Sequence, residues 1–274
     1  MGETSKWRAY RRLVIFGVGS WLVVARAIRA VLSPFPQRWE RSCPHVSRWA
    51  RLGARCLGIA VRPVGDLPPA GALVVCNHQG YADIVTAGGL FPSIFAARHD
   101  MRTWPMFGAL ARSGATIFIN RDNKRAGARG IGQLSAALAA GATVIAFPEG
   151  TSTDGSGLLP FRTGIFQAAV DAGAPVVPAA IRYLTLDDAP VDEGNRHLVG
   201  WFRGESFLAH IVQLGSHRVV HGEVRFAPVI AAPHRDRRTL AGAAETSVRE
   251  LLGLPTEQAP TQVGKRLDRP HGGT

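Results

Sequence analysis

Short apolar runs alternate along this chain with segments whose apolar positions recur at the three- and four-residue spacing of a helix. The runs have the length and the β-branched content of buried strands. They lie at residues 73–76, 94–97, 116–119, 144–147, 175–181 and 218–226. Helical segments separate or follow them, at residues 104–112, 126–139, 161–172, 201–214 and 238–252. Strands that alternate with helices predict an α/β fold with a mixed, mostly parallel sheet covered by helices.

The residues before the first of these strands have a different pattern. Residues 13–25 form one apolar run, which is shorter than the ~20 residues that a membrane-spanning helix needs. After a break at residues 33–36, a second helix at residues 37–59 has one apolar and one cationic face. The pattern predicts a first helix that lies in one leaflet of a membrane. A single-pass helix and packing of both helices on the protein's own core are the alternatives.

Positive charge is concentrated in the same N-terminal segment. The net charge of the chain is +12, and residues 1–62 hold twelve Lys or Arg against two acidic residues. Cations beside apolar sequence favour an anionic membrane surface, where each contributes ~1 kcal/mol. A basic chain can also bind nucleic acid, but the sequence has no nucleic-acid module motif, and its arginines are interleaved with Trp and aliphatic residues. We therefore expect a phospholipid surface as a partner, and no nucleic acid.

These patterns divide the chain into three parts. We expect a two-helix basic membrane anchor at residues 1–62, a catalytic domain at residues 63–254 and a disordered tail at residues 255–274. A Pro- and Gly-rich linker at residues 63–70 opens the domain. The three cysteines have no metal-ligand or CxxC spacing, which is typical of reduced thiols. We therefore expect the protein at the cytoplasmic face of the cell membrane.

The first candidate site follows the apolar run at residues 73–76, which ends in Asn-His-Gln-Gly-Tyr-Ala-Asp. His78 can take a proton from a hydroxyl group near neutral pH if a second group holds its ring in one tautomer. Asp83 lies five residues further on and can be that group. An Asp in the first turn of a helix is also favoured by the helix dipole alone. The pair predicts a general base, with a hydrogen-bonded core histidine as the alternative.

Two further strands end in polar residues. Arg121 follows the run at residues 116–119, and its planar guanidinium suits a phosphate, with an ion pair to Asp122 or Glu149 as the alternative. Glu149 follows the run at residues 144–147 and can accept a glycerol hydroxyl or form a structural ion pair with Arg121. Because ligands bind at the carboxyl ends of parallel strands, we expect these residues at one edge of the sheet.

The residues after Glu149 favour close approach of a ligand. Gly150 lets the backbone come near a bound group, because it has no Cβ. Thr151 and Ser152 add hydroxyl and N–H groups, which can bind phosphate. The segment therefore predicts a polar binding loop.

The order of these motifs resembles that of the glycerolipid acyltransferases, the family that includes 1-acylglycerol-3-phosphate acyltransferase. The resemblance covers about residues 70–182, with residues 158–164 also similar to that family. Four blocks carry it: Asn77-His78 with Asp83, Phe118-Ile119-Asn120-Arg121, Phe147-Pro148-Glu149-Gly150-Thr151-Ser152, and Val176-Val177-Pro178. It implies that His78 and Asp83 are catalytic. The residues to which it assigns glycerophosphate binding are Arg121, Glu149, Gly150 and Thr151.

The motifs of several other enzyme classes are missing from the sequence. It has no Gly-x-Ser-x-Gly elbow, P-loop, Gly-x-Gly-x-x-Gly or His-Glu-x-x-His. A histidine base without a protein nucleophile indicates that the substrate supplies the nucleophile. The resemblance implies acyl-CoA or acyl carrier protein as the co-substrate, with no cofactor and no metal ion.

We expect acyl transfer to the sn-2 hydroxyl of 1-acylglycerol-3-phosphate, which forms phosphatidate. Lyso-ornithine lipid or another lysolipid is the alternative acceptor. A non-catalytic membrane lipid-binding protein is the alternative of a different class. Two positions depart from the family pattern: Ala115 replaces a usual glycine, and the small residues Ala179 and Ala180 follow the fourth block.

Overall fold

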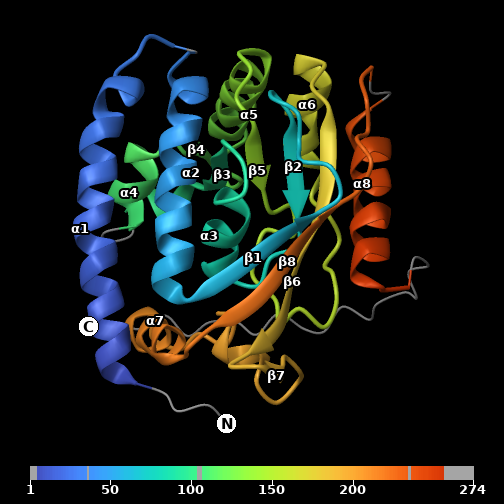
Figure 1. The fold of residues 1–274 in the computed structure, drawn as a ribbon. Helices are drawn as coiled ribbons and strands as arrows, with labels where there is room; N and C mark the ends of the chain where they lie inside the picture. Colours follow the sequence, from blue (N-terminus) through green and yellow to red (C-terminus); the bar gives the residue numbers. More distant parts are fainter. Residues whose placement is uncertain (1–4, 36, 104–106, 234–235, 256–274) are drawn as a thin grey trace, which may run out of the picture.

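A mixed β-sheet forms the centre of the computed structural model, which describes residues 5–35, 37–103, 107–233 and 236–255 (Figure 1). The strand order is β1-β8-β6-β2-β5-β3-β4, and β7 pairs with the end of β6. The strands are β1 (Ile59–Val64), β2 (Leu73–Cys76), β3 (Ile94–Arg98), β4 (Ile117–Ile119), β5 (Val144–Ala146), β6 (Val176–Leu186), β7 (Ala189–Pro190) and β8 (Val220–Phe226). Strands β6, β2, β5, β3 and β4 are parallel, whereas β8 runs antiparallel to β6. The predicted mixed, mostly parallel sheet is confirmed.

Helices cover both faces of this sheet, which explains why the central strands are continuously apolar. The helices that follow the strands are α3 (Ala82–Gly88), α4 (Phe107–Ser113), α5 (Lys124–Ala139), α6 (Phe166–Ala172) and α8 (Arg237–Leu252). Helix α6 contacts both α5 and α8, whereas α3 contacts α2 (Gln37–Leu57). All residues of β2 and β5 are buried between these layers. The parallel strands end at one edge of the sheet, at the bottom of Figure 1.

Helix α2 packs against the sheet domain. Its side chains Trp39 and Val46 are buried, and it contacts α3, β1 and β3. The apolar face that the sequence pattern assigned to a membrane is therefore covered by the protein's own core. The exposed face carries the arginines, among them Arg48 and Arg55.

Helix α1 (Lys6–Val31) lies outside α2 at the side of the molecule (Figure 1). The two helices approach closely, because a Cβ at Gly19 would meet the side chain of Leu52. Trp49 fixes their register, since its indole N–H donates to Ser20 Oγ at 3.0 Å and its ring lies 5.5 Å from that of Phe16. This contact leaves the opposite side of α1 uncovered.

The uncovered side of α1 carries an apolar stripe, defined by Trp7, Tyr10, Val14, Ile15, Val18, Trp21 and Leu22, all of which are exposed. Their three- and four-residue spacing places them on one helix face. Trp7 and Trp21 are 76% and 71% exposed. Among the described residues, no helix is both long and apolar enough to cross a membrane.

The N-terminal end of α1 is attached to α7 (Phe207–Ser216). The last carbonyl groups of a helix have no partner within the helix. Arg12 Nη1 donates to the carbonyl oxygens of Gly215 and His217 at 3.0 and 2.6 Å, and Arg8 Nη1 donates to that of Ser216 at 2.8 Å. Two of the arginines expected at a membrane surface therefore cap a helix of the domain.

Several element boundaries differ from those predicted. The predicted linker at residues 63–70 begins inside β1, which starts at Ile59 and also shortens the helix predicted to end there. The strand predicted at residues 175–181 continues to Leu186, because β8 pairs with it from Ala179 to Leu186. The helix predicted at residues 161–172 begins with a short 3₁₀ turn at Thr163–Ile165.

The helix predicted at residues 201–214 begins only at Phe207. Residue Trp201 forms a tertiary hydrogen bond instead, in which its N–H donates to the carbonyl oxygen of Gln79 at 2.8 Å. The first residues of the helix predicted at 104–112, and the tail from residue 256 onward, lie outside the described residues.

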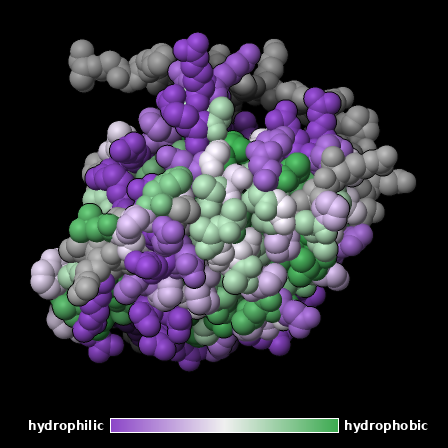
Figure 2. Space-filling model, turned by 90° about the horizontal axis from the view of Figure 1, so that it is seen from above, coloured by the Kyte–Doolittle hydropathy of each residue, from purple (hydrophilic) through white to green (hydrophobic). Residues whose placement is uncertain are grey.

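Ala115 adopts a left-handed backbone conformation, with φ of +54°. A glycine adopts this conformation without steric penalty, whereas alanine does not. The turn before β4 therefore keeps a geometry that favours glycine, although the glycine has been replaced. Figure 2 shows the end of the molecule opposite the edge at which the parallel strands end; hydrophilic and hydrophobic side chains are interspersed over its described surface.

Candidate active site

The turn between β2 and α3 places His78 beside Asp83. The imidazole Nδ1 of His78 lies 2.8 Å from Asp83 Oδ2. The histidine side chain is 20% exposed, whereas that of Asp83 is completely buried. The ring of His78 also stacks on that of Phe147, with centroids 4.2 Å apart and 17° between the planes. The imidazole is therefore held in one plane with one edge toward solvent.

The donors around Asp83 define the tautomer of His78. Asp83 Oδ2 also accepts the backbone N–H groups of Gln79 at 2.5 Å and Gly80 at 2.9 Å. An oxygen that accepts from these groups is an acceptor toward the imidazole too, so Nδ1 carries the proton and Nε2 is the basic nitrogen. The two N–H groups are occupied by this carboxylate, which excludes them as donors to a reaction oxyanion.

Glu149 fixes the backbone of the same turn. It accepts the N–H of His78 with Oε1 at 2.7 Å and the N–H of Leu159 with Oε2 at 2.9 Å. Its side chain is buried, and this burial raises its pKa to about 7, although both N–H bonds and the nearby His78 oppose the rise. The sequence suggested a hydroxyl acceptor or a partner of Arg121. Both oxygens instead hold the main chain.

The residues after Glu149 complete the hold on His78. Thr153 N–H donates to the carbonyl oxygen of His78 at 2.8 Å, so the two backbone groups of the histidine are bound by one loop. Ser152 Oγ donates to the carbonyl oxygen of Trp201 at 3.0 Å. Thr151 is exposed on the same loop. The loop thus connects the histidine turn to the segment before α7.

Three arginines gather on the other side of Gly150. A Cβ built at this glycine would overlap Arg121 Nη1 and the Nε atom of Arg162, so both guanidiniums lie over its main chain. Partial burial, and then the neighbouring charges of Arg162 and Arg98, lower the pKa of Arg121. All three arginines are exposed at the residue level. Guanidinium groups gathered beside an exposed loop can together bind an anion.

The structure brings the predicted residues to one edge of the sheet. His78 follows β2, Glu149 follows β5 and Arg121 follows β4, and these strands are parallel to one another through β3. Arg162 was not predicted from the sequence, although it stands in the segment similar to the family. Trp201 was not predicted either, because its contact depends on a loop that no local pattern indicates.

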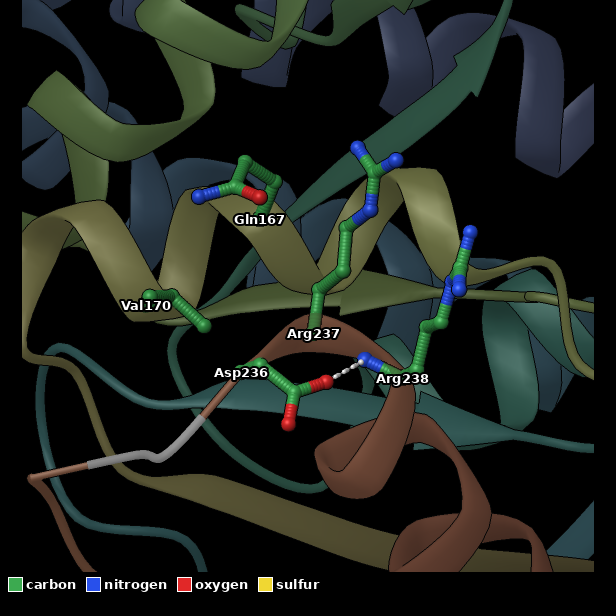
Figure 3. A pocket seen from close by; sticks show the side chains of 5 residues that line it. All are labelled: Gln167, Val170, Asp236, Arg237 and Arg238. Atoms are coloured by element: carbon green, nitrogen blue, oxygen red, sulfur yellow. Dashed lines mark hydrogen bonds between the residues drawn. The ribbon is translucent and has the colours of Figure 1, made fainter.

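A surface pocket lies at the opposite edge (Figure 3). Its lining residues come from α6 and from the start of α8, where Asp236 accepts the N–H of Arg238 at 2.7 Å. This end of α8 follows the bridge between Ile230 and Val176, at the amino end of β6. None of the predicted site residues lines this pocket.

Comparisons with known proteins identify the family of the chain. A family profile described as Acyltransferase matches residues 59–182. The lyso-ornithine lipid O-acyltransferase of Brucella abortus is 32% identical over 250 residues, which cover 85% of this chain and 93% of that protein. The 1-acyl-sn-glycerol-3-phosphate acyltransferase of Neisseria meningitidis is 33% identical over 182 residues, which cover 66% of this chain and 70% of that one.

A solved structure has the same fold. It is the crystal structure of the 1-acyl-sn-glycerophosphate acyltransferase PlsC from Thermotoga maritima, which matches with a TM-score of 0.63 and 19% identity over 90% of this chain and 93% of that chain. The order of the sequence blocks and the relative from Brucella abortus, which is similar over most of both chains, lead to one conclusion. The chain is an acyltransferase and belongs to the glycerolipid acyltransferase family.

Proposed function

We propose that the protein transfers a fatty acyl group from a thioester, acyl-CoA or acyl carrier protein, to the sn-2 hydroxyl of 1-acylglycerol-3-phosphate. The observation that carries this proposal is the juxtaposition of a histidine base with a cluster of arginines. Two consecutive residues connect them: the side-chain carboxylate of Glu149 accepts the N–H of His78, and Gly150 lies under Arg121 and Arg162.

The chemistry follows from the tautomer of His78. Nε2 of His78 takes the proton of the acceptor hydroxyl, and the oxygen of that hydroxyl attacks the carbonyl carbon of the thioester. Asp83 stabilises the imidazolium, because its carboxylate already accepts from Nδ1. When the tetrahedral intermediate collapses, the carbon–sulfur bond breaks and the imidazolium returns the proton to the leaving thiolate. Proton and charge balance without a covalent acyl-enzyme.

The arginine cluster supports a phosphomonoester on the acceptor. Such a group carries close to two negative charges and three acceptor oxygens, which suit several forked guanidinium donors. Arg121 and Arg162 are the two whose guanidiniums meet over Gly150. Arg98 is in part neutralised by Asp100, which accepts its Nη2 at 2.6 Å. The first two arginines are therefore the proposed phosphate ligands.

Lyso-ornithine lipid is the second candidate acceptor, and the relatives favour it. A lyso-ornithine lipid O-acyltransferase of Pseudomonas aeruginosa is 33% identical over 258 residues, which cover 91% of this chain and 92% of that protein. The similarity to proteins of this name therefore extends beyond residues 59–182 into the terminal segments. The carboxylate of that lipid would offer the arginines one negative charge.

We also propose that α1 attaches the enzyme to a membrane at the cytoplasmic face. The apolar stripe of α1 is the surface that supports this role, because a helix with one exposed apolar face binds in the interface plane. The stripe lies on the side away from α2, so lipid contact needs no rearrangement of the core. In this proposal, α2 is part of the domain that α1 attaches to the membrane.

An acceptor panel tests the reaction. Purified protein is assayed with lysophosphatidate and lyso-ornithine lipid, each with one acyl-CoA and one acyl carrier protein donor. We expect lysophosphatidate to be preferred and His78→Ala to be inactive with every pair. Preference for lyso-ornithine lipid would transfer the assignment to the second candidate. Transfer by His78→Ala at the wild-type rate would contradict the proposed base and the mechanism.

A further inference from the structure

The second carboxylate oxygen of Asp83 is bound by a residue outside the histidine turn. Tyr183 lies on β6, and its hydroxyl donates to Asp83 Oδ1 at 2.8 Å. The other oxygen, Oδ2, accepts His78 Nδ1 and two backbone N–H groups. Among the side-chain hydrogen bonds of the described residues, that of Tyr183 is the one that reaches the Asp83 carboxylate from outside the histidine turn.

The hydroxyl of Tyr183 is itself oriented. Thr86, which lies one helical turn after Asp83 in α3, places Oγ1 at 3.3 Å from the phenolic oxygen. Since the phenol donates to the carboxylate, the threonine hydroxyl is the donor in this second bond. Thr86 and Asp83 are completely buried, and Tyr183 is 8% exposed. Water therefore does not compete for these bonds.

We propose that Tyr183 is a positioning residue for the acyl transfer reaction: its hydroxyl fixes the rotamer of Asp83 and shares the charge of the carboxylate that orients His78. This role rests on the proposed function of His78 and Asp83. It means that β6, which lies outside the catalytic turn, helps to orient the base. Neither the motif blocks nor the sequence pattern points to it.

The electrostatic consequence has a definite sign. Removing the hydroxyl leaves Oδ1 without its donor, so more of the negative charge of Asp83 acts on the imidazole of His78. An imidazolium is then stabilised relative to neutral imidazole, and the base is protonated at higher pH. The acid limb of the pH–rate profile should move to higher pH, while the less restrained carboxylate lowers the maximal rate.

The other titratable groups around this network do not obscure the effect. Burial raises the pKa values of Tyr183, Tyr81 and Cys76, so these groups stay neutral over the assay range. Glu149, with its pKa raised to about 7 by burial, titrates near neutral pH in every variant. The informative quantity is therefore the difference between variants, not the position of one limb.

The test compares two variants, each of which loses one hydrogen-bonded tyrosine hydroxyl. Tyr183→Phe should lower kcat/KM about 10-fold, the size expected for one hydrogen bond to a charged group. Its acid limb should move upward by about half a pH unit. Tyr81→Phe removes the hydroxyl that lies 2.8 Å from His210 Nδ1, and should lose similar stability without moving the acid limb. Thermal unfolding of both variants measures that loss.

Thr86 supplies a second, milder test. Thr86→Val removes the donor to Tyr183 and should move the acid limb in the same direction by less, whereas Thr86→Ser keeps the hydroxyl and should match the wild type. An acid limb that stays in place in folded Tyr183→Phe would overturn the positioning role and leave the base intact. Activity retained by His78→Ala would instead remove the proposed function on which the role rests.

Discussion

Arg12 donates a hydrogen bond of 2.6 Å to the carbonyl oxygen of His217, across 205 residues of sequence. The same guanidinium reaches the carbonyl oxygens of Gly215 and Arg218. A positive charge at the end of α7 is favoured by the helix dipole as well as by these bonds. The arginine thereby connects α1 to the sheet domain.

The contact predicts different roles for two neighbouring arginines of α1. Arg12→Gln should lower the free energy of unfolding by about 1–2 kcal/mol, because it removes charged donors from the end of α7. Arg11 is exposed, and Arg11→Gln should leave stability nearly unchanged. Urea denaturation in mild detergent measures the free energy of unfolding of both variants. Equal stability of the two variants would contradict the capping role of Arg12.

The apolar stripe of α1 predicts membrane binding. Replacing Trp7, Val18 and Trp21 together with serine should lower binding to anionic lipid vesicles about 10-fold or more, because these side chains would enter the interface. Leu67→Ser, which alters a side chain that is 50% exposed in the loop after β1, is the control and should bind as the wild type does. Cosedimentation measures the fraction of protein bound to vesicles. Unchanged binding of the triple variant would show that the stripe is not the membrane-binding surface.

Asp83→Asn should abolish most of the activity while keeping the fold. The amide oxygen can accept the N–H groups of Gln79 and Gly80, and the amide nitrogen can donate to the hydroxyl of Tyr183. The negative charge that stabilises the imidazolium is lost, so kcat should fall about 10³-fold. Thermal unfolding reports the fold, and a loss of less than about 10-fold would show that the carboxylate charge is dispensable.

Gly150→Ala should weaken acceptor binding. Gly150 has φ of +80°, and an added Cβ would displace the guanidiniums of Arg121 and Arg162. We expect the KM for the acceptor to rise about 10-fold or more. A methyl group at Gly157, in the same loop, would meet no atom within 4 Å, so Gly157→Ala is a matched control. Similar KM values for both variants would argue against an anion site over Gly150.

The raised pKa of Glu149 predicts a pH-dependent stability. In the folded protein, the Glu149 side chain keeps its proton up to about pH 7. In the unfolded chain, the same carboxyl group has its ordinary pKa and loses the proton near pH 4.5. The folded state therefore binds more protons between these values, and the stability of the wild type falls as pH rises through this window. We expect a decrease of about 2–3 kcal/mol relative to Glu149→Gln between pH 5 and pH 8.

Urea denaturation of both proteins at the two pH values measures this difference. Glu149→Gln should be less stable throughout, because one amide cannot accept from both His78 and Leu159. A difference in stability that is the same at both pH values would mean that Glu149 is ionised in the folded protein across this range.

Strands β2 and β5 could be predicted because they are buried at every position and are therefore continuously apolar. The first strand could not. β1 contains Arg62 and Pro63, and it is an edge strand whose outer face is exposed. Its hydrogen-bonded neighbour, β8, lies far away in the sequence, so no local sequence pattern indicates the pairing.

The residues of the site divide in a similar way. His78 and Asp83 are close in sequence, and a short turn brings them together. Glu149 was predicted as a site residue because it follows a strand. Its hydrogen-bond partners are backbone N–H groups, which cannot be inferred from the residue types around it. Tyr183 lies beyond the apolar run at residues 175–181 that predicted the strand, and only the pairing of β6 with β2 reveals what its hydroxyl contacts.

The parallel pairing of β1 with β8 has a consequence for synthesis of the chain. The register joins Ile59 to Val220, so about 160 further residues must be made before this edge of the sheet can form. The contacts between α1 and α2 are short-range and can form long before. A helical hairpin that displays the stripe of α1 can therefore form on the ribosome ahead of the enzyme's own sheet. If that stripe binds lipid, the nascent chain contacts the membrane that contains its acceptor before its active site has formed.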